Sequence, residues 1–303
     1  MTLLDPSALE CLTAIVEEGG FERAATRLNI TQSAVSQRLR VLESQTGTVL
    51  VVRSRPIRPT AAGQLLIKHT KMQRLLRADL DRDLRELAPT SHHNAGQEER
   101  ISIAINADSI ATWALPALSL LAKDGIPLEI IADDQDFTQE WLREGQVFGC
   151  VTSLSMPLRG CRHVALGTMP YVAVASPEFA KQYCAKGITP SNFHQLPFIA
   201  FNRKDDLQSE FVSQALGLKQ VTLRQHFVPS SQGQVSAALT GWGVTVVPEL
   251  LVKAALENGS LVNVSPQHSL NVKLYWHCWN LESDLLDAIG SALQQAAKTA
   301  FNA

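Results

Sequence analysis

The segment from residue 21 to residue 47 constrains the fold most, because it reads as two helices joined by a very short turn. Apolar residues fall on one face of each helix at helical spacing: Phe21, Ala24, Ala25 and Leu28 in the first, and Ala34, Val35, Leu39 and Leu42 in the second. Between them, Asn29 tolerates left-handed backbone and Thr31 is a good N-cap. The pattern predicts a DNA-reading helix-turn-helix, and the alternative is a helical hairpin whose outer face is merely solvated.

The outer face of the second helix carries almost no acidic group and is rich in short polar side chains. In a helix-turn-helix such a face enters the DNA major groove, where polar side chains bond to base edges. The candidates for base contacts are Gln32, Ser33, Ser36 and Gln37. Thr31, Arg38 and Arg40 are better placed for phosphate or guanine contacts.

The flanking segments would complete a winged module over residues 1–59. Residues 5–18 form an amphipathic pattern that Gly19-Gly20 stops, which predicts the third helix that the hairpin needs to bury its apolar faces. After residue 47, a short β segment leads to a basic tip with prolines, which predicts a wing. Its Arg53, Arg55 and Arg58 would lie along the phosphate backbone or reach into the minor groove; the alternative is a solvated basic loop.

Charge is distributed unevenly along the 303 residues, although the formal net charge is only −2. Between residues 23 and 59, seven arginines stand against one acidic residue, Glu43. From residue 100 to the end, 14 basic residues stand against 17 acidic ones. A basic block at one end of a mildly acidic chain indicates a nucleic-acid module attached to something else.

Residues 60–87 predict one long helix that Thr60 caps. Its apolar stripe recurs at spacings of three, four and seven: Leu65, Met72, Leu76, Leu80, Leu84 and Leu87. A lone helix has no core of its own to bury such a stripe, so we expect a homodimer through this helix, with packing on the chain's own C-terminal part as the alternative. Residues 88–99 are polar and aperiodic, which predicts a hinge.

Residues 100–303 alternate strand and helix patterns, which predicts an effector domain of two open α/β lobes with largely parallel sheets. We place the first lobe at about 100–163 and 269–303 and the second at about 164–268. The expected strands are 101–105, 128–132, 147–151, 171–175, 198–201, 222–227, 244–247 and 273–279. The expected helices are 111–121, 137–143, 177–185, 207–215, 234–239, 248–257 and 283–300. Lobes of this kind bind ligands at the carboxyl ends of their strands, here in the cleft between them.

Several classes of protein are disfavoured. No apolar run approaches the ~20 residues that span a bilayer, and the N-terminus shows no signal-peptide pattern, so we expect a cytoplasmic protein. Five scattered cysteines without a CxxC pair predict reduced thiols and no metal site. No P-loop, HExxH or GxSxG arrangement occurs, and Gly241-Trp242-Gly243 is a weak dinucleotide signal, so we expect neither an enzyme nor a cofactor.

The motifs together carry a family resemblance. The stretches GFERAATRLNITQSAVSQRLRVLESQTG, LVVRSRPIRPTAAG and VSAALTGWGVTVVP resemble the LysR-type transcriptional regulators. IAINADSIATWALPAL and KLYWHCWN resemble more particularly the ArgP/LysG subgroup, which responds to lysine or arginine and controls basic amino acid transport and metabolism. The resemblance implies a winged helix-turn-helix, a dimerising linker helix and an effector domain like a type 2 periplasmic binding protein. It also implies dimers or tetramers that bend operator DNA and change polymerase access. Lys68 and His69 depart from the apolar stripe of the linker helix, which leaves the dimer register open.

Candidate effector residues lie where strands meet helices in the C-terminal part. A helix start with free N–H groups suits the carboxylate of an amino acid, and acidic side chains suit an ammonium or guanidinium group. In the first lobe the candidates are Asn106, Asp108, Ser109, Thr112, Asp133, Asp134 and Asp136. In the second lobe they are Phe201, Asn202, Ser230, Ser231 and Gln232. The alternatives are that these residues are helix caps and solvated turns, or that the chain binds an amino acid without any regulatory output.

Overall fold

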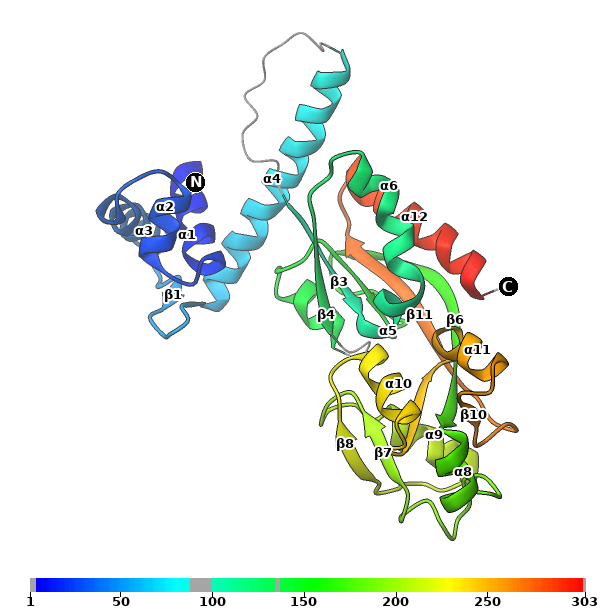
Figure 1. The fold of residues 1–303 in the computed structure, drawn as a ribbon. Helices are drawn as coiled ribbons and strands as arrows, with labels where there is room; N and C mark the ends of the chain where they lie inside the picture. The colour runs from blue at the N-terminus through cyan, green and yellow to red at the C-terminus, as the bar shows by residue number, and fades with distance from the viewer. Residues whose placement is uncertain (1–3, 88–99, 134–136, 302–303) are drawn as a thin grey trace. The chain divides into compact units, whose positions relative to one another are not determined.

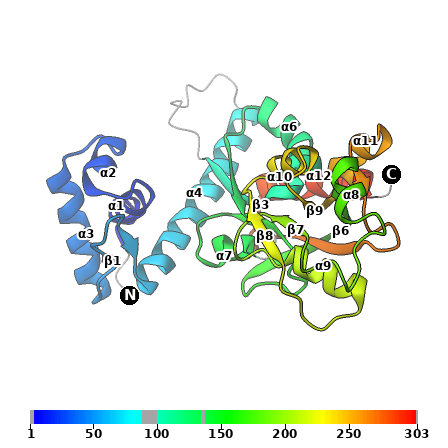
Figure 2. The ribbon, with the colours of Figure 1, turned by 60° about the horizontal axis from the view of Figure 1, so that its bottom comes forward.

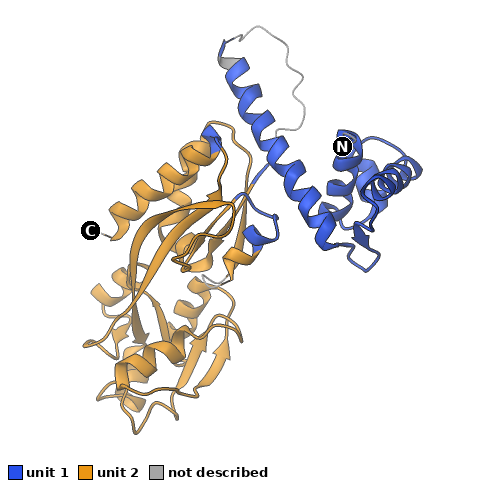
Figure 3. Cartoon of the chain, turned by 180° about the vertical axis from the view of Figure 1, so that it is seen from behind, with its two compact units in different colours: residues 1–101, 141–148, 282–285 blue, residues 102–140, 149–281, 286–303 orange. Residues whose placement is uncertain are grey.

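The structure, a computed structural model, describes residues 4–87, 100–133 and 137–301. The chain divides into two compact units, shown in blue and orange in Figure 3. The first comprises residues 1–101 together with 141–148 and 282–285, and the second comprises residues 102–140, 149–281 and 286–303. No helix among the described residues is long and apolar enough to cross a membrane.

The first unit contains the helix-turn-helix, the wing and the long helix (Figure 1). Its elements are α1 (Pro6–Glu17), α2 (Phe21–Arg27), α3 (Gln32–Thr46), β1 (Val51–Val52), β2 (Arg58–Pro59) and α4 (Ala61–Leu87). The turn between α2 and α3 places Asn29 at a φ of 53°, the left-handed conformation that asparagine tolerates. Thr31 caps α3 by accepting a hydrogen bond from the backbone N–H of Ala34 at 3.2 Å.

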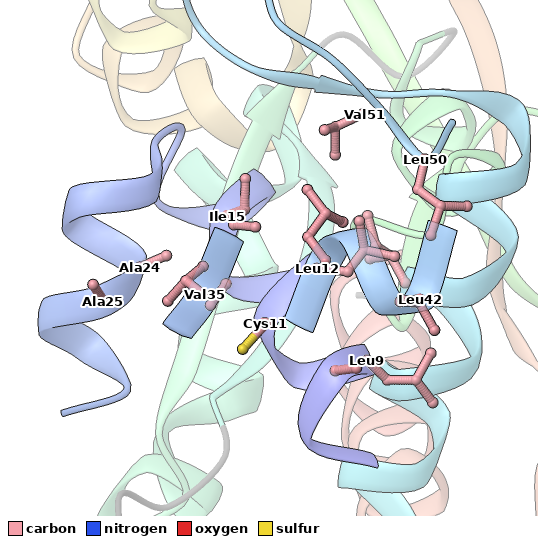
Figure 4. Packing of buried hydrophobic residues seen from close by; sticks show 14 residues of the cluster. Leu9, Cys11, Leu12, Ile15, Ala24, Ala25, Val35, Leu42, Leu50 and Val51 are labelled. Atoms are coloured by element: carbon pink, nitrogen blue, oxygen red, sulfur yellow. The ribbon is translucent and has the colours of Figure 1, made fainter. Parts of the chain in front are cut away.

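One apolar cluster holds this unit together (Figure 4). Leu12 and Ile15 of α1 meet Val35 and Leu42 of α3, and all four are fully buried. Leu50, at the base of the wing, belongs to the same cluster, and its backbone lies against α4. There, α4 approaches so closely that a Cβ on Gly63 would lie 2.1 Å from the carbonyl oxygen of Leu50, so only glycine fits.

An ion-pair cluster joins α1, α2 and α4 at the surface of the same unit. The guanidinium of Arg74 forms ion pairs with Glu10 and, at 3.3 Å, with Glu17, while Lys71 lies 3.6 Å from Glu17. Arg27 of α2 donates to the same Glu17 carboxylate at 2.6 Å. Burial alone would raise the pKa of Glu17, but the three neighbouring cations outweigh it and lower that pKa.

The second unit is built on a single nine-stranded sheet with the order β4-β3-β5-β11-β6-β9-β7-β8, and β10 pairs with β6 beside that path. The strands are β3 (Ile101–Asn106), β4 (Leu128–Asp133), β5 (Gly149–Thr152), β6 (Cys161–Ala175), β7 (Pro197–Ala200), β8 (Arg224–Phe227), β9 (Val244–Pro248), β10 (Val262–Asn263) and β11 (Leu270–Trp279). The helices that follow β3 in the chain are α5 (Ala107–Ser109), η1 (Ile110–Ala114), α6 (Leu115–Lys123), α7 (Thr138–Arg143), α8 (Pro177–Tyr183), α9 (Leu207–Leu216), α10 (Ser231–Leu239), α11 (Glu249–Glu257) and α12 (Asp284–Phe301). Residues 141–143 of α7 and 284–285 of α12 belong to the first unit.

Two strands, β6 and β11, run from one lobe of this unit into the other (Figure 1). The first lobe adds β3, β4 and β5 to them, with α6 and α12 on one face; the second adds β7, β8 and β9, whose strands can be followed in Figure 2. Because they share β6 and β11, the two lobes are built on one continuous sheet. On the helical face of the first lobe, the ring of Trp113 on η1 meets Phe301 of α12 edge-on, with centroids 5.6 Å apart.

The structure corrects several details of the sequence-based expectation. The sheet is mixed: the pairs β3–β5, β7–β8 and β7–β9 are parallel, but β5–β11, β11–β6 and β6–β9 are antiparallel. The strand expected at 171–175 is the end of the 15-residue strand β6, which starts at Cys161 because it bridges both lobes.

The helix expected from residue 111 begins directly after Asn106 and contains the π-helical turn η1. Pro116 accounts for the irregularity, because its ring nitrogen cannot donate to the carbonyl of Thr112 one turn earlier. The five cysteines are free thiols, and four of them are buried.

Candidate functional site

The recognition helix α3 presents the polar face that the sequence indicates. Gln32, Ser33, Gln37 and Arg40 are exposed, whereas Val35 and Leu39 of the same helix are buried. Ser36 is half-buried on the same helix. Two of the candidate DNA-contacting residues on and before α3 also make contacts within the unit: the Thr31 hydroxyl caps α3, and the Arg38 guanidinium points to the Cys11 sulfur at 3.9 Å.

The wing places its three arginines, Arg53, Arg55 and Arg58, in solvent-exposed positions. The guanidinium of Arg53 lies over the Phe21 ring, 6.0 Å from its centroid, which ties the wing to the start of α2. With α3, these arginines give the first unit one polar helix face and a basic tip, the arrangement that a winged helix-turn-helix offers to DNA.

The second unit contains a pocket at the carboxyl ends of β3, β4 and β7. It draws residues from both lobes: Ala107, Asp108, Asp133, Phe201, Asp205, Leu207, Gln234 and Val246. Three of these residues are acidic, and none of the described lining residues is basic. A pocket of this composition favours a cationic ligand group.

Asp108 lies at the wall of the pocket where the first lobe meets Tyr171 of β6. The residue as a whole is half-buried, but its carboxyl group is enclosed by protein atoms and accepts a hydrogen bond from the Tyr171 hydroxyl at 2.7 Å. Burial raises the pKa of this carboxyl; the hydroxyls of Ser231 and Tyr171 lower it, the negative charge of Asp205 raises it, and the pKa lies above its usual value overall.

Asp205 and the neighbouring polar residues fix the wall of the pocket in the second lobe. The Asp205 carboxylate accepts hydrogen bonds from the backbone N–H groups of Phe201 at 2.8 Å and Leu207 at 2.9 Å. The fully buried side-chain amide of Gln208 makes two hydrogen bonds to the backbone of Val246. Its oxygen accepts from the Val246 N–H at 2.8 Å, and its nitrogen donates to the Val246 carbonyl at 3.2 Å. These bonds hold the turn after β7 and the strand β9 at fixed positions beside the pocket.

Two further polar residues lie next to Asp108 in the chain, at the start of the helical segment. Asn106 and Ser109 are fully buried, and neither the Asn106 amide nor the Ser109 hydroxyl has a hydrogen-bond partner among the described residues. Because unsatisfied buried polar groups are costly in folded proteins, these two side chains are candidates to bond to a ligand of the pocket.

The sequence-based effector candidates divide into several groups, one of which is the buried pair Asn106 and Ser109 described above. The pocket brings together Asp108, Asp133 and Phe201, with Ser231 beside Asp108. Three candidates serve local structure: Thr112 donates to the carbonyl of Asp108, Asn202 accepts from the N–H of Lys204, and Ser230 caps α10. Gln232 is exposed and does not line the pocket. Asp134 and Asp136 lie outside the described residues.

Sequence reasoning missed Asp205, Leu207, Gln234, Val246 and Tyr171. Asp205 gave a usable signal, since it stands between a predicted strand and a predicted helix as Asp108 does. Tyr171 and Val246 gave none, because each reads as an ordinary member of an apolar strand.

Comparison with known proteins identifies the family of the chain. Residues 6–64 match the bacterial regulatory helix-turn-helix proteins of the lysR family, and residues 94–298 match the LysR substrate binding domain. The chain is a LysR-type transcriptional regulator.

Individual relatives of this regulator match it over almost its whole length. It is 40% identical over 302 residues to the transcriptional regulator ArgP of Aeromonas salmonicida, covering 99% of both chains. The crystal structure of ArgP from Mycobacterium tuberculosis matches with a TM-score of 0.82 and 38% identity, covering 98% of both chains. LysG from Corynebacterium glutamicum with its bound effector Arg matches with a TM-score of 0.72 and 32% identity, covering 97% of this chain and 98% of that one. The predicted two-domain fold and the non-enzymatic role are therefore confirmed.

Proposed function

We propose that this regulator senses a basic amino acid, lysine or arginine, in the pocket of its second unit and controls genes of amino acid transport or metabolism. The observation that carries the proposal is the composition of the pocket, in which three acidic and no basic side chains line the described wall. The LysG structure with bound Arg supports it, since that protein shares 32% of its sequence with this chain.

Within the pocket, Asp108, Asp133 and Asp205 are the candidates to contact the ammonium or guanidinium groups of the effector. Asn106 and Ser109 are the candidates to contact its carboxylate, because each has hydrogen-bonding capacity that the described residues leave unused. A ligand with charge at both ends would then contact both sets.

For DNA, we propose that Gln32, Ser33, Ser36 and Gln37 read base edges and that Arg38, Arg40 and the wing arginines contact phosphates. The exposure of these side chains on α3 and on the wing supports the assignment. Thr31 contributes through its cap, which fixes the first turn of α3.

For assembly, we propose a homodimer through α4, from which tetramers on DNA can be built. Leucines of the stripe are exposed on the single chain, from 37% for Leu84 to 71% for Leu65 and 82% for Leu87. Leu80→Lys should therefore shift the dimer toward monomer in sedimentation, whereas Leu120→Lys on α6 should leave the dimer intact. If the Leu80→Lys protein stayed dimeric, the proposal that α4 forms the dimer interface would be contradicted.

The test of the effector is a thermal-shift comparison of lysine, arginine and neutral amino acids on the full chain. Binding to the folded state alone raises the melting temperature, so lysine or arginine should raise it and a neutral amino acid of similar size should not. Absence of a shift with both basic amino acids would contradict the proposal. Footprinting of the operator with and without the active ligand then links binding to DNA contacts.

A further inference from the structure

Polar and acidic side chains from several helices, strands and turns surround the carboxyl group of Asp108 and influence whether it is protonated. Tyr171 of β6 donates its hydroxyl to Oδ2 of Asp108 at 2.7 Å. The buried hydroxyl of Ser231, at the first turn of α10, also acts on this carboxyl, although it makes no hydrogen bond of normal geometry among the described residues. Asp205 faces it from the turn before α9, and Asp133 lines the same pocket from the end of β4. Among these described neighbours the charged groups are acidic, and the two hydroxyls are neutral.

Two like charges in an enclosed pocket cannot both ionise without cost, and enclosure itself disfavours the charged form. The pKa of Asp108 is accordingly raised, with burial as the largest cause. A cation inside the pocket reverses this balance, because attraction at close range favours the carboxylate over the acid.

We propose that Asp108 holds a proton when the pocket is empty and loses it to solvent when the cationic group of the effector binds, so that effector binding and proton release are one coupled step. The inference rests on the proposed function, since it requires a cationic effector in this pocket. The balance is simple: the O–H bond of the Asp108 carboxyl breaks, its proton passes to water or buffer, and the ligand cation takes the place of that proton.

Tyr171 is the positioning residue in this coupling. Its hydroxyl holds the carboxyl by the 2.7 Å hydrogen bond, and its ring is fully buried in β6, so the donor cannot swing away. Because a donated hydrogen bond favours the carboxylate, loss of the hydroxyl should raise the pKa of Asp108 further. Tyr171→Phe removes only that oxygen.

The experiment is calorimetric titration of arginine into the full chain over a range of acidic to neutral pH. At each pH, two buffers of different ionisation enthalpy are used. The heats should differ between the buffers and report release of up to about one proton per arginine bound. On the acid side of the profile the affinity should fall about tenfold per pH unit, and it should level off where Asp108 is already ionised.

Two variants assign the proton to Asp108. Tyr171→Phe should move the whole affinity profile to higher pH, which a merely structural effect would not do. Tyr275→Phe is the matched control, since Tyr275 lies on neighbouring β11 beside the rings of His163 and His277, and it should leave the profile in place.

The outcomes are separable. Equal heats in both buffers together with a pH-independent affinity would overturn the coupling and leave the proposed function standing. A profile that Tyr171→Phe does not move would overturn the assignment of the proton to Asp108. Absence of binding by both arginine and lysine would overturn the proposed function and the inference together.

Discussion

Two carboxyl groups of this regulator differ in what the chain supplies to neutralise them. Glu17, in the first unit, is surrounded by the cations Arg74, Lys71 and Arg27, and its pKa is lowered. Asp108, in the second unit, has hydroxyls and the carboxylate of Asp205 around it, and its pKa is raised. The first arrangement is complete within the fold and serves structure. The second has no cation among the described residues that line the pocket, an arrangement that favours a cationic ligand.

Asp108→Asn removes the charge that is central to this contrast. Arginine affinity should fall by about 2 kcal/mol or more, or at least roughly 30-fold, because a ligand cation would lose its enclosed anionic partner. The melting temperature of the empty protein should rise at neutral pH, since folding no longer has to enclose a carboxyl group whose charged form the pocket disfavours.

The matched control is Asp206→Asn, which neutralises an exposed carboxylate that does not line the pocket. Calorimetry and thermal melting measure both effects. An Asp108→Asn protein that binds arginine normally would show that the two carboxyl groups do not differ in the way described.

Gln37→Ala tests whether the first unit can lose its function while the second keeps its own. Loss of a base contact should weaken binding to the operator by about 1–3 kcal/mol and leave binding to unrelated DNA unchanged. The exposed Gln45, near the end of α3, provides the control Gln45→Ala. Gel-shift assays measure affinity for the operator and for unrelated DNA. If Gln37→Ala weakened binding to both DNAs equally, Gln37 would not contribute to sequence recognition.

Glu17→Gln should cost stability rather than ligand affinity. The substitution leaves Arg74 and Lys71, whose side chains are about nine-tenths buried, without one of their carboxylate partners. We expect a loss of about 1–2 kcal/mol, reduced because the Glu17 side chain is itself 24% exposed. Urea unfolding measures the loss of stability, and the control is Glu22→Gln, which changes an exposed residue of α2. If Glu17→Gln also weakened arginine binding, the role of Glu17 would not be purely structural, and the contrast with Asp108 would fail.

The smallest effect is the pH dependence of these stability differences, and the two carboxyl groups should respond in opposite senses. Glu17 has a lowered pKa, so its stabilisation is present above the unfolded value of about 4.3 and is lost as pH falls through the folded pKa. Asp108 has a raised pKa, so its destabilisation is present above the folded pKa and disappears as pH falls toward about 3.9.

As the pH falls, the stability difference between the wild-type protein and Asp108→Asn should therefore disappear first. The difference between the wild-type protein and Glu17→Gln should disappear only at lower pH. Urea unfolding at a series of pH values follows both differences. Disappearance in the reverse order would contradict the assignment of the two pKa directions.

The sequence predicts the local parts of this architecture well, and the reason is physical. The helix-turn-helix follows from the periodicity of 21–47 and from Asn29 and Thr31, whose conformations depend on near neighbours. The mixed sheet does not follow, because the pairing of β6 with β11 joins residues about a hundred positions apart, and a strand pattern does not specify its partner.

The pocket shows the same limit. Asp108 and Asp133 are predictable because Asp133 ends a strand and Asp108 follows the end of one by two residues, whereas Gln234 and Tyr171 reach the site only through the tertiary fold. Ser230 was expected in the site because it starts a helix, but its hydroxyl accepts from the N–H of Gly233 at 3.1 Å and serves as a cap. Residue type at an element boundary therefore predicts a cap as readily as a ligand contact.

The most direct test of the central claim compares arginine with citrulline in calorimetric titrations of the wild-type protein. Citrulline keeps the shape of arginine and both of its backbone charges, but its side chain ends in a neutral ureido group. If the acidic pocket of Asp108, Asp133 and Asp205 selects a cation, arginine should bind at least roughly 30-fold more tightly. Equal affinity for the two ligands would contradict the claim.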